Sequence, residues 1–181
     1  MGIGLVGALG SLAIFTSLFD PFAAAKAFVI SVGVAGLFGY AIIEIFKNKG
    51  TIFGDQKKYF VFVLLAFIGL FLARTFTTSD INGALFGVVG RHSGFISYLA
   101  YVLIFILTMI FLREKYFHLI LRSLLVASLI AGFYSLLEKF GAEPWKMSKV
   151  YGGTSGLFGN PNFSGAFLSL GVILSLWCLI N

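Results

Sequence analysis

Long apolar runs dominate this sequence and limit what the chain can fold into. A helix that crosses the hydrocarbon core of a bilayer needs about 20 mostly apolar residues. Six runs reach or approach that length. They are Ile3–Phe19, Ala27–Phe46, Tyr59–Phe76, Phe95–Leu112, Leu119–Leu137 and Phe163–Ile180. The runs predict six membrane-spanning helices.

The composition excludes a soluble domain. Apolar types make up 59% of the 181 residues and charged types 11%, whereas soluble proteins average roughly 45–50% and about 25%. The spans of a β-barrel would show as alternating segments of about ten residues, which these runs are not. Because lipid offers no hydrogen-bond partners to the backbone, such runs fold as helices. We expect an all-α, polytopic transmembrane bundle of about six spans that forms one integral membrane domain over residues 1–181.

The charges between the runs predict the orientation. The net charge is +6, and since the cations lie in loops we expect a membrane protein with no nucleic-acid partner. The link Lys47–Lys58 carries four lysines, and the turn Arg113–Phe117 carries two more cations. Cytoplasmic loops are enriched in Lys and Arg, so these loops and the N-terminus are expected inside. The outer segments are then Phe19–Lys26, Thr77–Gly94 and Glu138–Asn162. Because the chain ends directly after the sixth run, we expect it to be the first half of a larger bundle.

The sharpest outer feature is the glycine-rich segment Tyr151–Gly165. Asn160 is a favoured N-cap and Pro161 a favoured first helical residue, so the sixth span is expected to start there. The free N–H groups and the dipole of a helix start bind anions, and glycines let a ligand approach the backbone closely. The segment is either an anion site or a simple turn before a capped helix. It is not a P-loop, because no Gly-Lys-Ser/Thr follows.

Two arginines on the expected outer side are candidates for the same anion. Arg74 ends the third run among apolar neighbours, where a guanidinium normally has a polar partner or a wet cavity. Arg91 stands just before the fourth run and is either an interfacial anchor or a phosphate ligand with a planar fork of donors. His92 is interpreted as a bystander. Together with the start of the sixth span, the arginines suit a lipid-linked phosphate or pyrophosphate.

At these residues the sequence resembles the O-antigen ligase superfamily, which includes O-antigen ligases, O-antigen polymerases and bacterial protein O-oligosaccharyltransferases. The stretch Gly156–Leu168 (GLFGNPNFSGAFL) resembles the family's GTFGNPN-x-x-A-x-x-L signature, with Gly165 shifting the small residue by one position. The stretch Leu85–Leu99 resembles its L-x-G-x-x-x-R-x-x-G-x-x-x-x-L segment. The sequence Phe-Asp-Pro-Phe at 19–22, followed by Lys26, resembles the loop after the family's first span. The resemblance covers most of the chain in order and spacing.

The resemblance implies a multi-pass glycosyltransferase-type ligase or polymerase of the bacterial inner membrane. Such enzymes act in cell-envelope polysaccharide synthesis, including that of lipopolysaccharide, and use no metal or other cofactor. They move a glycan from an undecaprenyl-pyrophosphate carrier to a glycan, lipid or protein acceptor. The resemblance implies that Arg91, helped by Arg74, contacts the pyrophosphate and that Asn160 and Asn162 shape the loop beside it. The family's catalytic His lies in a large outer loop of the second half, so the catalytic residue here is unknown and we expect this chain to be inactive alone.

Two other functions stay open at this stage. A transporter or flippase for a lipid-linked or anionic solute also aims helix N-termini at an anion, but it predicts paired ionisable residues near mid-span, and the runs hold almost none. A non-enzymatic membrane scaffold would use the apolar faces only for packing. It predicts that Arg91→Ala and Asn160→Ala are both tolerated.

Overall fold

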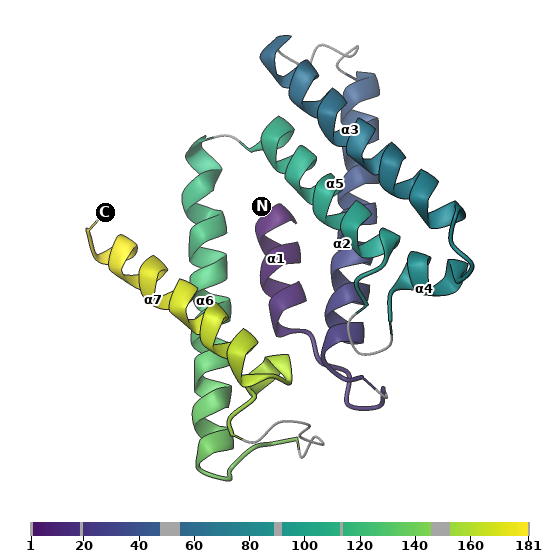
Figure 1. Cartoon of the computed structure of the whole chain (residues 1–181). Coiled ribbons are helices and arrows are strands. Elements are labelled where there is room, and N and C mark those ends of the chain that lie inside the picture. Colours follow the sequence, from purple (N-terminus) through teal and green to yellow (C-terminus); the bar gives the residue numbers. More distant parts are fainter. Residues whose placement is uncertain are drawn as a thin grey trace. The chain divides into compact units, whose positions relative to one another are not determined.

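The computed structural model describes residues 2–18, 20–47, 55–88, 92–112, 114–145 and 153–180. All regular elements in these ranges are helical, which confirms the expected all-α class there. In chain order they are α1 (Gly2–Leu12), α2 (Ala23–Lys47), α3 (Asp55–Phe76), α4 (Ile81–Phe86), α5 (Phe95–Phe111), α6 (Glu114–Lys139), the 3-10 turn η1 (Gly156–Phe158) and α7 (Pro161–Ile180) (Figure 1).

A helix covers part or all of each of the six apolar runs, but the helices differ in length. Three are long and apolar enough to cross a membrane: α2, the Tyr116–Lys139 part of α6, and α7. The apolar parts of the other three, Gly2–Leu12, Val61–Phe76 and Phe95–Phe111, are shorter. The described residues thus hold three candidate spans, which is consistent with a membrane protein, and the count of six stays a prediction.

Helix α1 ends earlier than its apolar run predicts. The run extends to Phe19, whereas the helix ends at Leu12. Beyond it the chain turns back, and the backbone N–H of Phe15 donates to the carbonyl of Pro21 (3.0 Å). Lys26 Nζ donates to the carbonyl of Ala13 (2.9 Å). Non-helical backbone is tolerated near lipid when protein groups supply its partners, so these contacts explain the early end.

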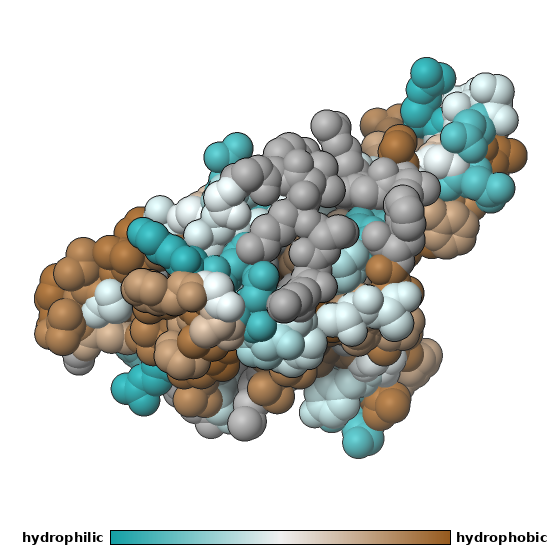
Figure 2. Space-filling view, turned by 90° about the horizontal axis from the view of Figure 1, so that it is seen from below, coloured by the Kyte–Doolittle hydropathy of each residue, from teal (hydrophilic) through white to brown (hydrophobic). Residues whose placement is uncertain are grey.

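Large apolar side chains stay exposed along the helices. Phe62 is 71% exposed, Leu70 74% and Leu179 83%, and the viewed face of the molecule in Figure 2 has broad hydrophobic areas. Soluble monomers rarely expose large contiguous apolar surfaces. These faces are therefore interpreted as surfaces for lipid or for other membrane helices.

The chain forms two compact units, one from residues Met1–Val29 and Lys115–Asn181 and the other from Ile30–Glu114. In the first unit the core lies where α1, α6, η1 and α7 meet. Its buried members are Ala131, Tyr134 and Leu157, surrounded by Leu12, Ile14, Phe158, Phe167 and Leu168. The buried Leu157 anchors η1 in this core, so the glycine-rich turn sits directly on the packed part of the unit.

In the second unit, α3 and α5 pack through aromatic side chains. The ring of Phe71 lies 5.9 Å from that of Phe95 and 5.2 Å from that of Tyr98, centroid to centroid. The short helix α4 follows α3, and the Asp80 carboxylate caps it by accepting from the N–H of Gly83 (2.9 Å). The segment between the third and fourth runs is thus partly ordered as a helix.

Candidate functional site

The glycine-rich turn before α7 is held from both sides by close packing. Gly156 and Gly159 have positive φ angles of 57° and 68°, which L-residues with a side chain rarely adopt. A Cβ at Gly156 would lie 2.6 Å from Ser135 Oγ. A Cβ at Gly159 would overlap the ring of Phe22. Glycine is therefore required at both positions by backbone angle and by space.

A buried carboxylate from α6 binds the start of this turn. Glu138 is 6% exposed. Its Oε2 accepts from the backbone N–H of Gly156 (2.6 Å), and its Oε1 accepts from the N–H and the hydroxyl of Ser155 (3.0 and 3.1 Å). A carboxylate with several such donors is well stabilised despite its burial. The hydroxyl of Ser164, on α7, donates in turn to the carbonyl of Ser155.

The anion at this turn is thus supplied by the protein itself. Sequence reasoning predicts an anion site at the N–H groups that begin α7, behind the glycine-rich turn. The structure has an anion upstream of them, on the N–H groups of Ser155 and Gly156. That anion is the carboxylate of Glu138. An external phosphate at the turn would have to use other donors.

Asn160 and Asn162 lie together at the start of α7. The helix begins at Pro161, and Asn160 Oδ1 accepts from the backbone N–H of Asn162 (2.9 Å). The predicted N-cap and first helical residue are therefore confirmed. Asn160 is half-buried and Asn162 is exposed. Their expected contact with a pyrophosphate stays a prediction.

The loop after α1, which is far from the turn in sequence, contacts the same turn. Asp20 Oδ1 accepts from the N–H groups of Phe22 and Ala23 (3.1 and 2.9 Å) and so caps α2. The ring of Phe22 covers Gly159, and Lys26 Nζ lies 4.7 Å from the centroid of the Phe158 ring. Two of the segments that carry the family resemblance therefore form one packed cluster.

In the other unit, Arg74 lines a small polar groove. Its side chain is exposed, and Nη1 donates to Thr77 Oγ1 (3.3 Å). The groove has a volume of about 250 Å³. It is lined by Phe71, Arg74, Thr75, Thr78, Gly83, Ala84 and Ser93. The predicted polar surroundings of Arg74 are thus present as hydroxyl groups and a groove.

The segment that carries Arg91 is closed at its base by two glycines. Gly87 has φ 85°, and a Cβ built on Gly94 would overlap the backbone of Gly87 and Leu85. Backbone therefore lies directly on backbone where the segment begins and ends. Arg91 itself lies outside the described residues, so its predicted role is untested. On the far side of it, His92 has φ 47°, and its carbonyl accepts from Ser97 Oγ (2.5 Å).

The three predicted ligands that lie among the described residues are divided between the two units. Asn160 and Asn162 belong to the first, and Arg74 belongs to the second. In the described ranges no three His, Cys, Asp or Glu side chains gather as a metal site would require.

Sequence reasoning missed Glu138, which it treated only as the boundary of an outer segment. The available signal was an acidic residue at the end of an apolar run, since ionisable residues there are costly unless paired. It also gave Lys26 only a place in a motif, whereas its Nζ joins the end of α1 to the start of α2.

Comparison of the chain with protein-family models, with curated proteins and with solved structures gave no match.

Proposed function

We propose that the chain binds the pyrophosphate end of an undecaprenyl-linked glycan, as the donor-side part of a bacterial inner-membrane transferase. The observation that carries the proposal is the groove shared by Arg74 and Ser93. Ser93 follows Arg91 by two residues, so the groove adjoins the segment that bears a second guanidinium. A guanidinium group beside hydroxyl donors is suited to phosphate oxygens.

The transfer would break the bond between the sugar and the pyrophosphate. Negative charge then grows on the departing phosphate oxygen, and positive groups placed there lower the barrier. Arg74 and Arg91 have this role in the proposal, and the hydroxyls of Thr78 and Ser93 add hydrogen bonds. The acceptor is a hydroxyl or amino group of a glycan, lipid or protein, and the base that activates it is not assigned to any residue of this chain.

One further observation supports the proposal. Two of the segments that resemble the O-antigen ligase family are 19–22 with Lys26, and Gly156–Leu168. They pack on each other where Phe22 meets Gly159 and Lys26 meets Phe158. Because Glu138 already holds the N–H groups of Ser155 and Gly156, the proposal assigns the pyrophosphate to side chains. The side chains that the turn itself offers to an anion are the carboxamides of Asn160 and Asn162.

The test is glycan transfer by the complete protein in cells that lack the native gene. Arg91→Ala is expected to abolish transfer, and Arg74→Ala to reduce it by about 10²–10³-fold, the usual effect of losing one donor to a developing oxyanion. Arg74→Lys keeps the charge without the fork and is expected to lie in between. Arg122→Ala, which removes an exposed guanidinium from α6, is the matched control and should behave like the native protein.

Each alternative function predicts a different result. A scaffold predicts normal transfer in Arg74→Ala and Arg91→Ala at normal membrane abundance, which would refute the proposal. A flippase predicts that the lipid-linked donor itself disappears from the outer face of the membrane in the arginine variants. Labelling of the donor in intact cells detects this loss.

A further inference from the structure

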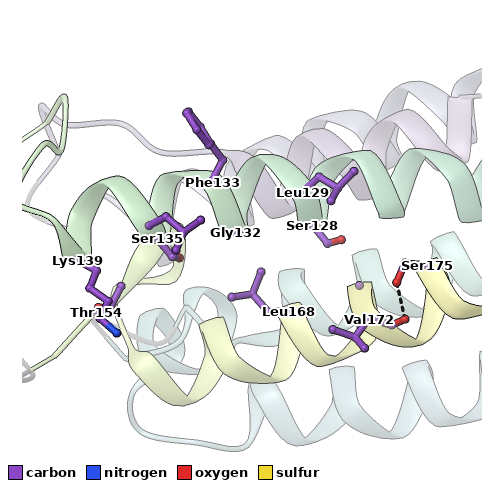
Figure 3. A pocket seen from close by; sticks show the side chains of 12 residues that line it. Ser128, Leu129, Gly132, Phe133, Ser135, Lys139, Thr154, Leu168, Val172 and Ser175 are labelled. Carbon is purple, nitrogen blue, oxygen red and sulfur yellow. Dashed lines mark hydrogen bonds between the residues drawn. The ribbon is translucent and has the colours of Figure 1, made fainter.

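A groove runs between α6 and α7 in the first unit, on the side of these helices that no described residue covers. It has a volume of about 620 Å³, within the range of about 300–1,000 Å³ that is typical of ligand sites. It is lined by Ser128, Leu129, Gly132, Phe133, Ser135, Leu136, Lys139, Thr154, Leu168, Gly171, Val172 and Ser175 (Figure 3).

The walls of the groove are apolar in effect, although three serines line it. The hydroxyl of Ser128 donates to the carbonyl of Leu125 (2.9 Å), and that of Ser135 to the carbonyl of Ala131 (2.9 Å). Ser175 donates to its own helix in the same way, to the carbonyl of Val172 (2.8 Å). Because these hydroxyl groups are already bonded within their own helices, a ligand in the groove does not have to supply hydrogen-bond partners for them.

Small residues create the groove by bringing the two helices close together. A Cβ on Gly171 would overlap the hydroxyl of Ser128, and one on Gly132 would lie 3.3 Å from Leu168 Cδ2. Such close approach through Gly and Ser is usual between membrane helices. It leaves the larger side chains Leu129 and Val172 as the rims of the groove.

One end of the groove is polar and positively charged. Figure 3 places Lys139 and Thr154 at that end and Ser175 at the other. Lys139 is the only charged side chain among the twelve lining residues, and it is exposed at the last residue of α6. From Ser128 to Lys139 the helix rises about 16 Å at about 1.5 Å per residue. This is close to one leaflet, or half of the hydrocarbon core of about 30 Å.

We propose that this groove binds one anionic phospholipid, with an acyl chain along α6 and α7 and its phosphate beside Lys139 and Thr154. The length of the groove matches one leaflet and its walls match a hydrocarbon chain. Lys139, the one cation among the lining residues, lies where a head group would be. Charge complementarity selects an anionic lipid over a zwitterionic one. The site is separate from the Arg74 groove and does not depend on the transferase proposal.

The test uses the full chain in detergent, titrated with dioleoyl phosphatidylglycerol or dioleoyl phosphatidylcholine, with bound lipid counted by native mass spectrometry. One phosphatidylglycerol is expected to be retained in preference to phosphatidylcholine. Lys139→Ala should weaken retention about fivefold, which corresponds to about 1 kcal/mol per Lys near an anionic surface. Lys47→Ala removes the same charge from the end of α2, where Lys47 pairs with Glu44 (4.0 Å), and should leave retention unchanged.

Filling the groove with a larger side chain tests whether the acyl chain of the lipid lies there. Val172→Trp replaces a lining residue that is 59% exposed, and Ile173→Trp replaces its neighbour, 64% exposed and outside the groove. Only Val172→Trp is expected to expel the lipid, with an unchanged helical circular dichroism spectrum in both variants. Equal retention of the two lipids, or equal effects of the two tryptophans, would overturn the proposal. Displacement by equimolar undecaprenyl phosphate, or a lipid-free dimer that Val172→Trp dissociates, would assign the groove to another occupant and overturn it too.

Discussion

The carboxylate of Glu138 lies 2.6 Å from the backbone nitrogen of Gly156, although the two residues are eighteen positions apart in the chain. This contact joins the end of α6 to the turn that starts α7. The N–H groups of that turn therefore already donate to a carboxylate of the protein itself. The turn is therefore preorganised without any ligand.

Removing the carboxylate is expected to destabilise the turn. In Glu138→Ala the buried N–H groups of Ser155 and Gly156 lose their acceptor, and each unsatisfied group costs about 1–3 kcal/mol. We expect a net loss of roughly 3 kcal/mol, since removal of a buried charge offsets part of this cost. Glu138→Gln keeps one acceptor oxygen and should lose about half as much. Thermal unfolding in detergent and hydrogen exchange at Gly156 measure the two effects.

The control for this prediction is Glu44→Gln on α2. Its partner Lys47 is 4.0 Å away and well exposed, and such pairs contribute about 0–1 kcal/mol. If Glu138→Ala melts no lower than Glu44→Gln, the buried contact does not stabilise the turn.

Gly159→Ala is expected to destabilise the packed cluster around Phe22. The new Cβ would overlap the Phe22 ring, and φ 68° is unfavourable for alanine. Each effect costs on the order of 1–3 kcal/mol. Combining Gly159→Ala with Phe22→Ala should relieve only the overlap, so a double-mutant cycle is expected to give a coupling energy above about 0.5 kcal/mol.

The matched control is Gly165→Ala in α7. A Cβ there would meet no heavy atom within 4 Å among the described residues. Alanine is favoured over glycine in a helix interior by about 0.8–1.0 kcal/mol, so this variant should be at least as stable as the native protein. Equal destabilisation by both glycine replacements would show that close packing at Gly159 is not the cause.

Local chemistry was sufficient to predict several helix boundaries. Helix α5 begins at Phe95 and α7 at Pro161, as the apolar run and the Asn-Pro cap predict, because capping depends on neighbours in sequence. The end of α1 was predicted wrongly, since it depends on the contact of Lys26 with the carbonyl of Ala13. That contact exists only after the chain has turned back.

The candidate site was predictable only in part for the same reason. The glycine-rich turn was recognised as able to bind an anion, because glycines and free N–H groups are visible in sequence. Its occupant was not recognised, since nothing local pairs Glu138 with Gly156. The groove at Arg74 likewise combines Thr75 from α3 with Ser93, which lies two residues before α5. Only the packing of α3, α4 and α5 brings these two residues together.

Replacing Asn160 is expected to separate its structural role from its proposed contact with pyrophosphate. Asn160→Ala removes the cap on the N–H of Asn162 and should cost about 1 kcal/mol. Asn160→Asp keeps an accepting oxygen, so thermal stability should stay close to native. In the proposed function a carboxylate at this position would repel the phosphate, and glycan transfer should fall although the fold is intact.

Asn162→Ala is the companion variant. Asn162 is exposed, so its replacement should change the free energy of unfolding by less than about 0.5 kcal/mol. Native transfer by Asn160→Asp would limit Asn160 to capping and remove it from the proposed site.

Closure of the segment that carries Arg91 is expected to depend on Gly94. In Gly94→Ala the Cβ would overlap the backbone of Gly87 and Leu85, and backbone atoms, unlike a flexible side chain, cannot move aside locally. We expect a loss of roughly 1–3 kcal/mol and faster hydrogen exchange at Ser97, whose N–H donates to the carbonyl of Gly94 (3.1 Å). Gly69→Ala, in α3 with open space around the new Cβ, should show neither effect. In the proposed function, opening this base misplaces Arg91, so glycan transfer should fall with Gly94→Ala even at a temperature where the variant remains folded. A folded Gly94→Ala variant with native transfer would show that closure by the two glycines does not position the arginine.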